Sequence, residues 1–141
     1  TAWLVINLET KKIEPVETFV KNAYKLKDRC LIKEPIPKIK GVEGKAEHVF
    51  MHQVKFSSID LNHHVNNVSY LQWYLDYLPN GLALKPVTNI VVNYLHEVRL
   101  SFKVNIYYDI LEKEDGMHVK CEMVNAATDQ AACRIEAVHK K

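Results

Sequence analysis

The feature that most constrains the fold is an apolar, aromatic segment that is followed by a series of strand-length runs. Residues 66–78 repeat apolar or aromatic side chains at spacings of three and four, which predicts a helix ended by Pro79-Asn80-Gly81. Its predicted buried face is Val68, Leu71, Leu75 and Leu78, widened by Tyr70, Trp73, Tyr74 and Tyr77. A helix this apolar must be covered by other elements.

One run before this helix and four runs after it have the length and composition of β-strands. They are residues 46–56, 88–98, 102–112, 117–126 and 132–139. Polar and apolar side chains alternate along residues 117–123, and a period of two predicts a strand with one buried face and one solvent-exposed face. The order of elements predicts an α+β domain in which an antiparallel β-sheet wraps around a long central helix.

The N-terminal third of the chain has a different organisation. Residues 2–8 form a strand-like apolar run without an initial methionine, and residues 17–32 show a weak helical pattern among basic residues. The prolines of Glu34-Pro35-Ile36-Pro37-Lys38 indicate a linker. We therefore predict a strand and linker segment at 1–44 and a compact domain at 45–141, and we expect the chain to be cut from a longer one.

Composition limits the classes of function. The chain has 141 residues, 48% of them hydrophobic and 26% charged, which is typical of a folded domain with a core. A net charge of +2 is too small to indicate nucleic-acid binding, and no run resembles a membrane span or a signal peptide. Three cysteines without CxxC spacing favour a reducing compartment, so we expect a cytoplasmic protein.

A dense polar cluster precedes the predicted helix. Its members are Asp60, Asn62, His63, His64, Asn66 and Asn67. A helix N-cap accounts for one Asp or Asn but not for the whole set with His64, so the residue types favour a functional site. The free N–H groups and positive dipole end of a helix can hold a polarised carbonyl or an anion there.

The histidines do not form a metal-ligand pattern. The only HxxxH spacing, His48 to His52, falls in a predicted strand, and no third ligand stands at a suitable distance. Cys121 and Cys133 lie in predicted strands, where a free cysteine is usually a small buried hydrophobe. We therefore expect no metal and no other cofactor.

The polar cluster also carries a resemblance to a known family. Residues 60–73, D-L-N-H-H-V-N-N-V-S-Y-L-Q-W, resemble the D-x-N-x-H-V-N-N-x-x-Y-x-x-W signature of plant and bacterial acyl-acyl-carrier-protein (acyl-ACP) thioesterases. Residues 93–98 resemble that family's Y-x-x-E-C stretch, and residues 2–12 are similar to the end of its first hot-dog unit. The resemblance implies a double hot-dog protein, of which this chain holds the last strand of the first unit and the whole second unit.

The resemblance implies hydrolysis of fatty acyl-ACP thioesters to free fatty acid, which ends fatty acid synthesis. The candidate catalytic residues, matched position by position, are Asp60, Asn62, His64 and Glu97. We expect Glu97 or Asp60 to accept a proton from an attacking water. Asn62 and His64 would orient the water or the thioester oxygen. The family often carries a cysteine where this chain has Val98, which leaves water rather than a thiol as the nucleophile.

Further signature residues are expected to bind the substrate. They are Val65, Asn66, Asn67, Tyr70 and Trp73. Backbone N–H groups near Val65 and Asn66 would stabilise the developing oxyanion, and one or two of the helix aromatics would line an acyl tunnel.

The expected partners are an acyl carrier protein and a second hot-dog unit. Basic residues of 21–29 and 38–45 would meet the acidic carrier by charge complementarity. The second unit would be either a first hot-dog unit or another copy of this chain in a homodimer.

Two alternatives stay open at this stage. An acyl-CoA thioesterase of the hot-dog fold would use similar polar residues, and rates on matched CoA and carrier thioesters would separate the two. A non-catalytic acyl-binding or dimerisation module would bind the acyl group without hydrolysing it.

Overall fold

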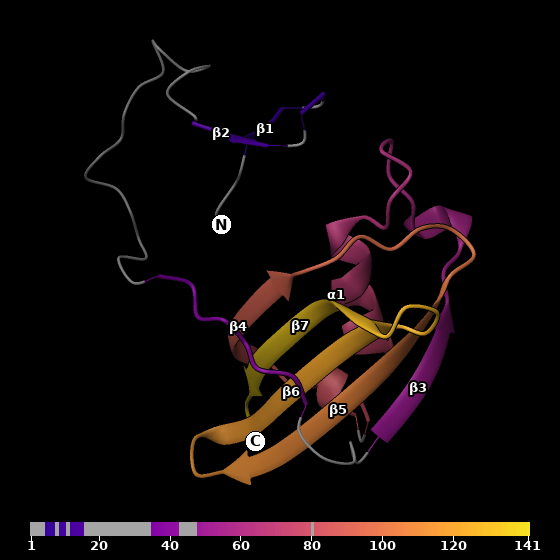
Figure 1. Cartoon of the computed structure of the whole chain (residues 1–141). Coiled ribbons are helices and arrows are strands. Elements are labelled where there is room, and N and C mark those ends of the chain that lie inside the picture. Colours follow the sequence, from indigo (N-terminus) through magenta and orange to yellow (C-terminus); the bar gives the residue numbers. More distant parts are fainter. Residues whose placement is uncertain (1–4, 8, 11, 16–34, 43–47, 80) are drawn as a thin grey trace. The chain divides into compact units, whose positions relative to one another are not determined.

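A computed structural model describes residues 5–7, 9–10, 12–15, 35–42, 48–79 and 81–141 (Figure 1). The chain divides into two compact units, Thr1–Pro35 and Ile36–Lys141. In the first unit, β1 (Val5–Ile6) pairs antiparallel with β2 (Ile13–Glu14). The strand predicted over 2–8 is thus seen at β1, whereas the helix predicted over 17–32 lies outside the described residues.

The second unit is built on a five-stranded antiparallel sheet with the spatial order β3-β5-β6-β7-β4. The strands are β3 (His48–Gln53), β4 (Val87–Tyr94), β5 (Lys103–Lys113), β6 (Gly116–Asn125) and β7 (Gln130–His139). Tight turns join β5, β6 and β7, so neighbours in sequence pair in space. All five strand predictions are confirmed, with ends that differ by a few residues.

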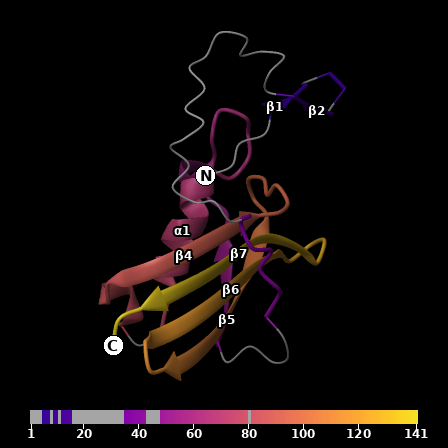
Figure 2. The ribbon, with the colours of Figure 1, turned by 90° about the vertical axis from the view of Figure 1, so that its left-hand side faces the viewer.

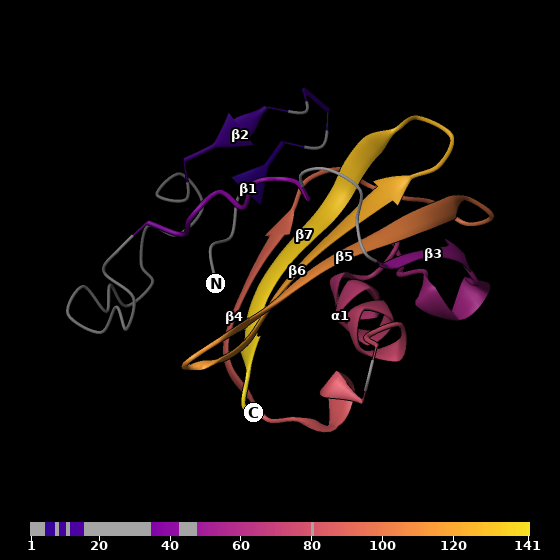
Figure 3. The ribbon, with the colours of Figure 1, turned by 90° about the horizontal axis from the view of Figure 1, so that it is seen from below.

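One α-helix covers one face of this sheet. Figure 2 and Figure 3 show α1 (Asn67–Asp76) beside the curled sheet, with the short 3₁₀ turns η2 (Phe56–Ser58) and η3 (Leu82–Leu84) on either side of it in the sequence. The Asn66 side chain caps the helix by accepting a hydrogen bond from the Val68 N–H at 2.9 Å. The helix is shorter than predicted because the chain leaves helical geometry at Tyr77, shortly before Pro79.

The buried side of α1 differs from the predicted one. Tyr70, Trp73 and Tyr74 are buried, whereas Val68 is 58% and Leu75 is 42% exposed. The prediction that Val68 and Leu75 face the core is therefore wrong. Leu78 is buried and Leu71 packs against the core, as predicted. Because successive helical residues are about 100° apart, Val68 and Leu75 lie farther round the helix, away from the sheet. The larger aromatic rings fill the space under the curved sheet.

The core lies between α1 and the inner face of the sheet. Along β6, Val119, Cys121 and Met123 are buried and Lys120 is exposed, which confirms the predicted alternation. Cys121 and Cys133 are buried free thiols, and burial raises the pKa of Cys133 to about 12. Both cysteines therefore act as small apolar core residues.

Residues 36–42, here called the strap, are the first described residues of the second unit. Ile39 of the strap is buried, while Lys38 and Lys40 are exposed. The boundary predicted at 44/45 stays a prediction, because residues 43–47 lie outside the described part of the chain. Within that described part, no helix is long and apolar enough to cross a membrane.

Candidate active site

Asp60 organises the turn between β3 and α1. Its Oδ1 accepts hydrogen bonds from the backbone N–H groups of Asn62 at 2.8 Å and His64 at 3.3 Å. Its own N–H donates to the His64 carbonyl at 2.9 Å. This local bonding, typical of Asp in turns, lets His63 adopt the left-handed region at φ 62°. The turn therefore holds His64 in one defined place.

The structure brings His64 and Glu97 into contact, although they come from different segments. His64 Nε2 lies 3.0 Å from Glu97 Oε2, and the two side chains are 25% and 69% exposed. A short antiparallel bridge positions them, with His64 opposite Arg99 and the Val65 N–H donating to the Val98 carbonyl at 2.8 Å. Because Val65 and Val98 point into the core, the side chains of His64 and Glu97 point outward on the same side.

The remaining signature asparagines have distinct surroundings. The exposed Asn62 side chain makes no hydrogen bond to the described residues, so it is available to a ligand. Asn66 is committed to capping α1. The Asn67 carbonyl accepts a hydrogen bond from the Tyr94 hydroxyl at 3.2 Å, which ties the start of the helix to the end of β4.

The backbone donors expected for the oxyanion require a correction. The Val65 N–H is bonded to Val98, and the Asn66 N–H donates to the Ser58 carbonyl at 2.8 Å, so neither is free. The Asn67 N–H, at the first position of α1, has no acceptor among the residues that the structure describes. Sequence reasoning had no signal for this shift, because it depends on which carbonyls the neighbouring segments present.

Tyr70 and Trp73 lie in the core in this structure. Their rings pack edge to face at 5.3 Å between centroids, and Trp73 also stacks on His52 at 4.3 Å. Burial raises the pKa of the Tyr70 hydroxyl, which keeps it neutral. Their expected role beside an acyl chain stays a prediction.

A hollow of about 370 Å³ lies on the other face of the sheet. Its lining includes Asn89, Leu111, His118 and Glu136, and none of the predicted site residues. Among the described residues, no group of three or more His, Cys, Asp or Glu side chains is placed to hold a metal ion. Among the predicted catalytic residues, the structure joins His64 and Glu97 directly, beside the start of α1.

Comparison with known proteins places this chain in a family. A family model of the acyl-ACP thioesterase C-terminal domain matches residues 42–141. The acyl-ACP thioesterase from Bacteroides thetaiotaomicron is 25% identical with a TM-score of 0.69, and the match covers 96% of this chain and 53% of that one. For the 12:0-ACP thioesterase from Umbellularia californica, the identity is 17%, the TM-score 0.78 and the coverage 94% and 51%.

A third similar structure belongs to a different kind of thioesterase. The 1,4-dihydroxy-2-naphthoyl-CoA thioesterase from Synechocystis is 14% identical with a TM-score of 0.57, and the match covers 65% of this chain and 79% of that one. No curated protein sequence matches significantly. The chain spans about half the length of the two acyl-ACP thioesterases. The fold is the hot-dog fold that the resemblance implied, and the chain belongs to the family of acyl-ACP thioesterase C-terminal domains.

Proposed function

We propose that this chain contributes the catalytic unit of a thioesterase that hydrolyses fatty acyl-ACP to free fatty acid and carrier protein. The observation that carries the proposal is the 3.0 Å contact between His64 and Glu97 beside the open start of α1. Family membership supports thioester hydrolysis as the reaction. A solvent-accessible carboxylate next to an imidazole and a helix N-terminus suits attack by water on a polarised carbonyl.

Glu97 is a better general base than Asp60 in this geometry. Asp60 Oδ1 is engaged by two backbone N–H groups of its own turn, whereas Glu97 is open to water. Glu97 takes a proton from water as the water oxygen attacks the thioester carbon. His64 holds the Glu97 carboxylate in position, and Asn62 orients the water or the thioester.

Attack by water gives a tetrahedral intermediate that carries an oxyanion. The Asn67 N–H at the positive end of the α1 dipole stabilises this oxyanion while the new carbon–oxygen bond forms. The carbon–sulfur bond breaks next, and the proton held by Glu97 passes to the departing thiolate. The products are a free fatty acid and a thiol, and no metal or other cofactor takes part in these steps.

Hydrolysis of matched acyl-ACP and acyl-CoA substrates tests this proposal. We expect faster release of fatty acid from the carrier thioester, with a rate advantage that declines as salt is added, because the exposed Lys38 and Lys40 can meet an acidic carrier. Equal or faster CoA hydrolysis would favour an acyl-CoA thioesterase. Acyl binding without any hydrolysis would favour a non-catalytic module.

We also propose that a second hot-dog unit covers the β4 edge. β4 is an edge strand, and Ile90 and Tyr94 on it are exposed, as are Val68 and Leu75 on α1. If a second copy of this chain supplies that unit, Ile90→Lys should convert a dimer to a monomer in analytical ultracentrifugation. The matched control is Leu111→Lys, which changes an exposed leucine on the opposite face of the sheet and should leave the dimer intact.

A further inference from the structure

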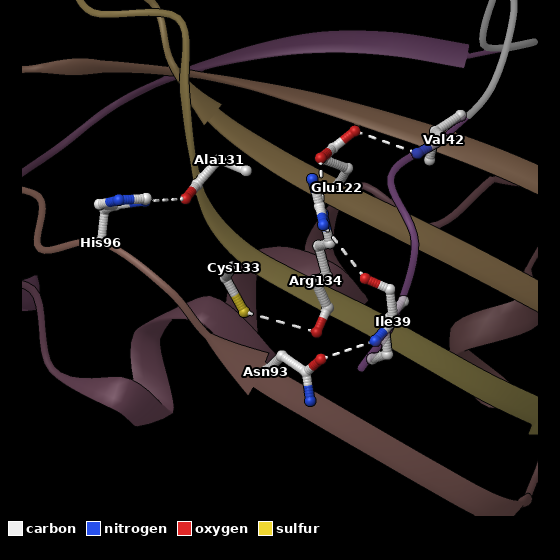
Figure 4. A network of polar contacts seen from close by, with 8 residues as sticks. All are labelled: Ile39, Val42, Asn93, His96, Glu122, Ala131, Cys133 and Arg134. Atoms are coloured by element: carbon white, nitrogen blue, oxygen red, sulfur yellow. Dashed lines mark hydrogen bonds and ion pairs between the residues drawn. The ribbon is translucent and has the colours of Figure 1, made fainter. Parts of the chain in front are cut away.

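The outer face of the sheet, opposite α1, carries a row of polar side chains from three adjacent strands. Asn93 on β4 is the register partner of Arg134 on β7, and Arg134 is the register partner of Glu122 on β6. Figure 4 shows these three side chains beneath the strap. They hold the strap through its backbone N–H and C=O groups.

The Asn93 side chain makes two hydrogen bonds to the backbone of the strap. Its Oδ1 accepts a hydrogen bond from the Ile39 N–H at 2.8 Å, and its Nδ2 donates to the Pro37 carbonyl at 3.2 Å. The Ile39 side chain is buried, which adds an apolar anchor between these two bonds. The end of β4 is therefore fastened to the strap.

Arg134 and Glu122 complete the row. Arg134 Nη1 donates to the Ile39 carbonyl at 3.1 Å, and Glu122 Oε2 accepts from the Val42 N–H at 3.0 Å. Arg134 Nε donates to Glu122 Oε1 at 2.7 Å, so the two side chains also hold each other. A Cβ on Gly41 would lie 2.9 Å from Glu122 Oε2, which indicates how closely the strap is seated.

The segment after Asn93 is anchored at each residue up to Glu97. The Tyr94 hydroxyl donates to the Asn67 carbonyl at 3.2 Å, the Leu95 N–H donates to the Ala132 carbonyl at 2.8 Å, and His96 Nδ1 donates to the Ala131 carbonyl at 2.8 Å. Glu97 itself is largely exposed, and its side-chain contact among the described residues is with His64. Because little packing surrounds the carboxylate, its position depends on this anchored backbone.

We propose that Asn93 is a positioning residue for Glu97. By fastening the end of β4 to the strap, it fixes the point from which the Tyr94–Glu97 segment leaves the sheet, and so holds the Glu97 carboxylate against His64. This inference rests on the proposed function for its kinetic consequence, but the position of Glu97 can be measured without any turnover. The strap thereby influences a site on another part of the unit through β4.

The test compares Asn93→Ala with Asn89→Ala in the full chain. Asn89 is the same residue type on the same strand and the same face, and its side chain has no hydrogen bond to the described residues. We expect Asn93→Ala to lower kcat on a saturating acyl thioester about tenfold with little change in KM, because misplacement of a catalytic group costs rate more than binding. Asn89→Ala should leave both values unchanged.

A second readout is the side-chain ¹⁵N NMR spectrum of His64 at one pH. We expect Asn93→Ala to move the His64 Nε2 resonance toward its position in Glu97→Gln, where the carboxylate contact is lost. Asn93→Asp keeps the acceptor for the Ile39 N–H and should recover part of both effects. A chain that hydrolyses nothing would contradict the proposed function but would still report the His64 shift.

The proposal is overturned by an unchanged His64 resonance in Asn93→Ala, whether or not the thermal unfolding midpoint falls. It is also overturned if Asn89→Ala lowers kcat as much as Asn93→Ala does. Either result would mean that Asn93, Arg134 and Glu122 only attach the strap to the sheet and do not position Glu97.

Discussion

The two ends of α1 each hold an imidazole, but in opposite surroundings. At the start of the helix, His64 contacts Glu97 at 3.0 Å, and both side chains reach solvent. Near the other end, His139 is fully buried, and its Nε2 is joined to the Tyr74 hydroxyl by a hydrogen bond of 2.7 Å. The residue types are similar, so accessibility separates a pair that a ligand can reach from one that is enclosed in the core.

Near the C-terminal end of α1, the buried side chains form a small hydrogen-bond network within the apolar core. The Tyr108 hydroxyl donates to the Tyr74 carbonyl at 2.7 Å, and burial raises the pKa of both tyrosines. His139 Nδ1 is buried without a partner among the described residues. A buried polar group without a hydrogen bond lowers the free energy of unfolding. Substitutions at the buried end should therefore mainly change stability, and substitutions at the exposed end should mainly change activity.

The largest effect is expected for Glu97→Gln. Loss of the proposed general base should lower kcat about 10²- to 10⁴-fold, while the thermal unfolding midpoint should stay unchanged because the side chain is mostly exposed. Steady-state hydrolysis and calorimetry measure the two quantities. The control Glu112→Gln changes another exposed carboxylate, on β5, and should not affect turnover. Near-normal turnover in Glu97→Gln would remove Glu97 from the mechanism.

His139→Ala should have the next largest effect, on stability instead. Removing a buried ring and leaving the Tyr74 hydroxyl without its partner should lower the free energy of unfolding by about 3 kcal/mol. Urea denaturation measures this loss, and the partly exposed His118 serves as control through His118→Ala. If His139→Ala instead abolished turnover in a protein that remained fully folded, the contrast between the two ends would be wrong.

Tyr108→Phe sharpens the comparison by removing one hydroxyl only. The Tyr74 carbonyl would lose its hydrogen bond, and we expect a loss of about 1 kcal/mol in the free energy of unfolding. Tyr107→Phe is the matched control, since Tyr107 is the neighbouring residue on the other face of β5 and is only half-buried. Equal losses in the two variants would argue against a special role for the buried network.

The smallest effect concerns His52, whose environment lies between those of His64 and His139. Burial, and then the charge of Lys55, lower its pKa below the ordinary 6.5, while Asp76 opposes the shift. As the pH falls below 6.5, the unfolded chain takes up the proton first, so the free energy of unfolding declines until the lower folded pKa is passed.

Urea denaturation between about pH 8 and about pH 5 measures this dependence. We expect the decline to be shallower in His52→Gln than in the native chain, because the variant lacks the titrating ring. A steeper decline in His52→Gln would mean that His52 is stabilised, not destabilised, by protonation.

Local sequence patterns determined most of the architecture. The period of two along 117–123 and the helix end before Pro79 depend on neighbours a few residues away, and the structure confirms them. The sequence offered several Asp and Asn residues as a helix cap, and the structure selects Asn66. The polar cluster at 60–67 could likewise be recognised from the sequence because its members are adjacent. Glu97 joined the candidate set through the resemblance and not through any local pattern.

Tertiary structure decided what depends on distant partners. Val68 and Leu75 are as apolar in sequence as the buried Trp73, and only the position of the sheet decided which of them are buried. The Val65 and Asn66 N–H groups lost their expected role because Val98 and Ser58 present carbonyls to them. The His64–Glu97 contact and the attachment of the strap to Asn93 arise in the same way, since the folded backbone brings together residues that are far apart in the sequence.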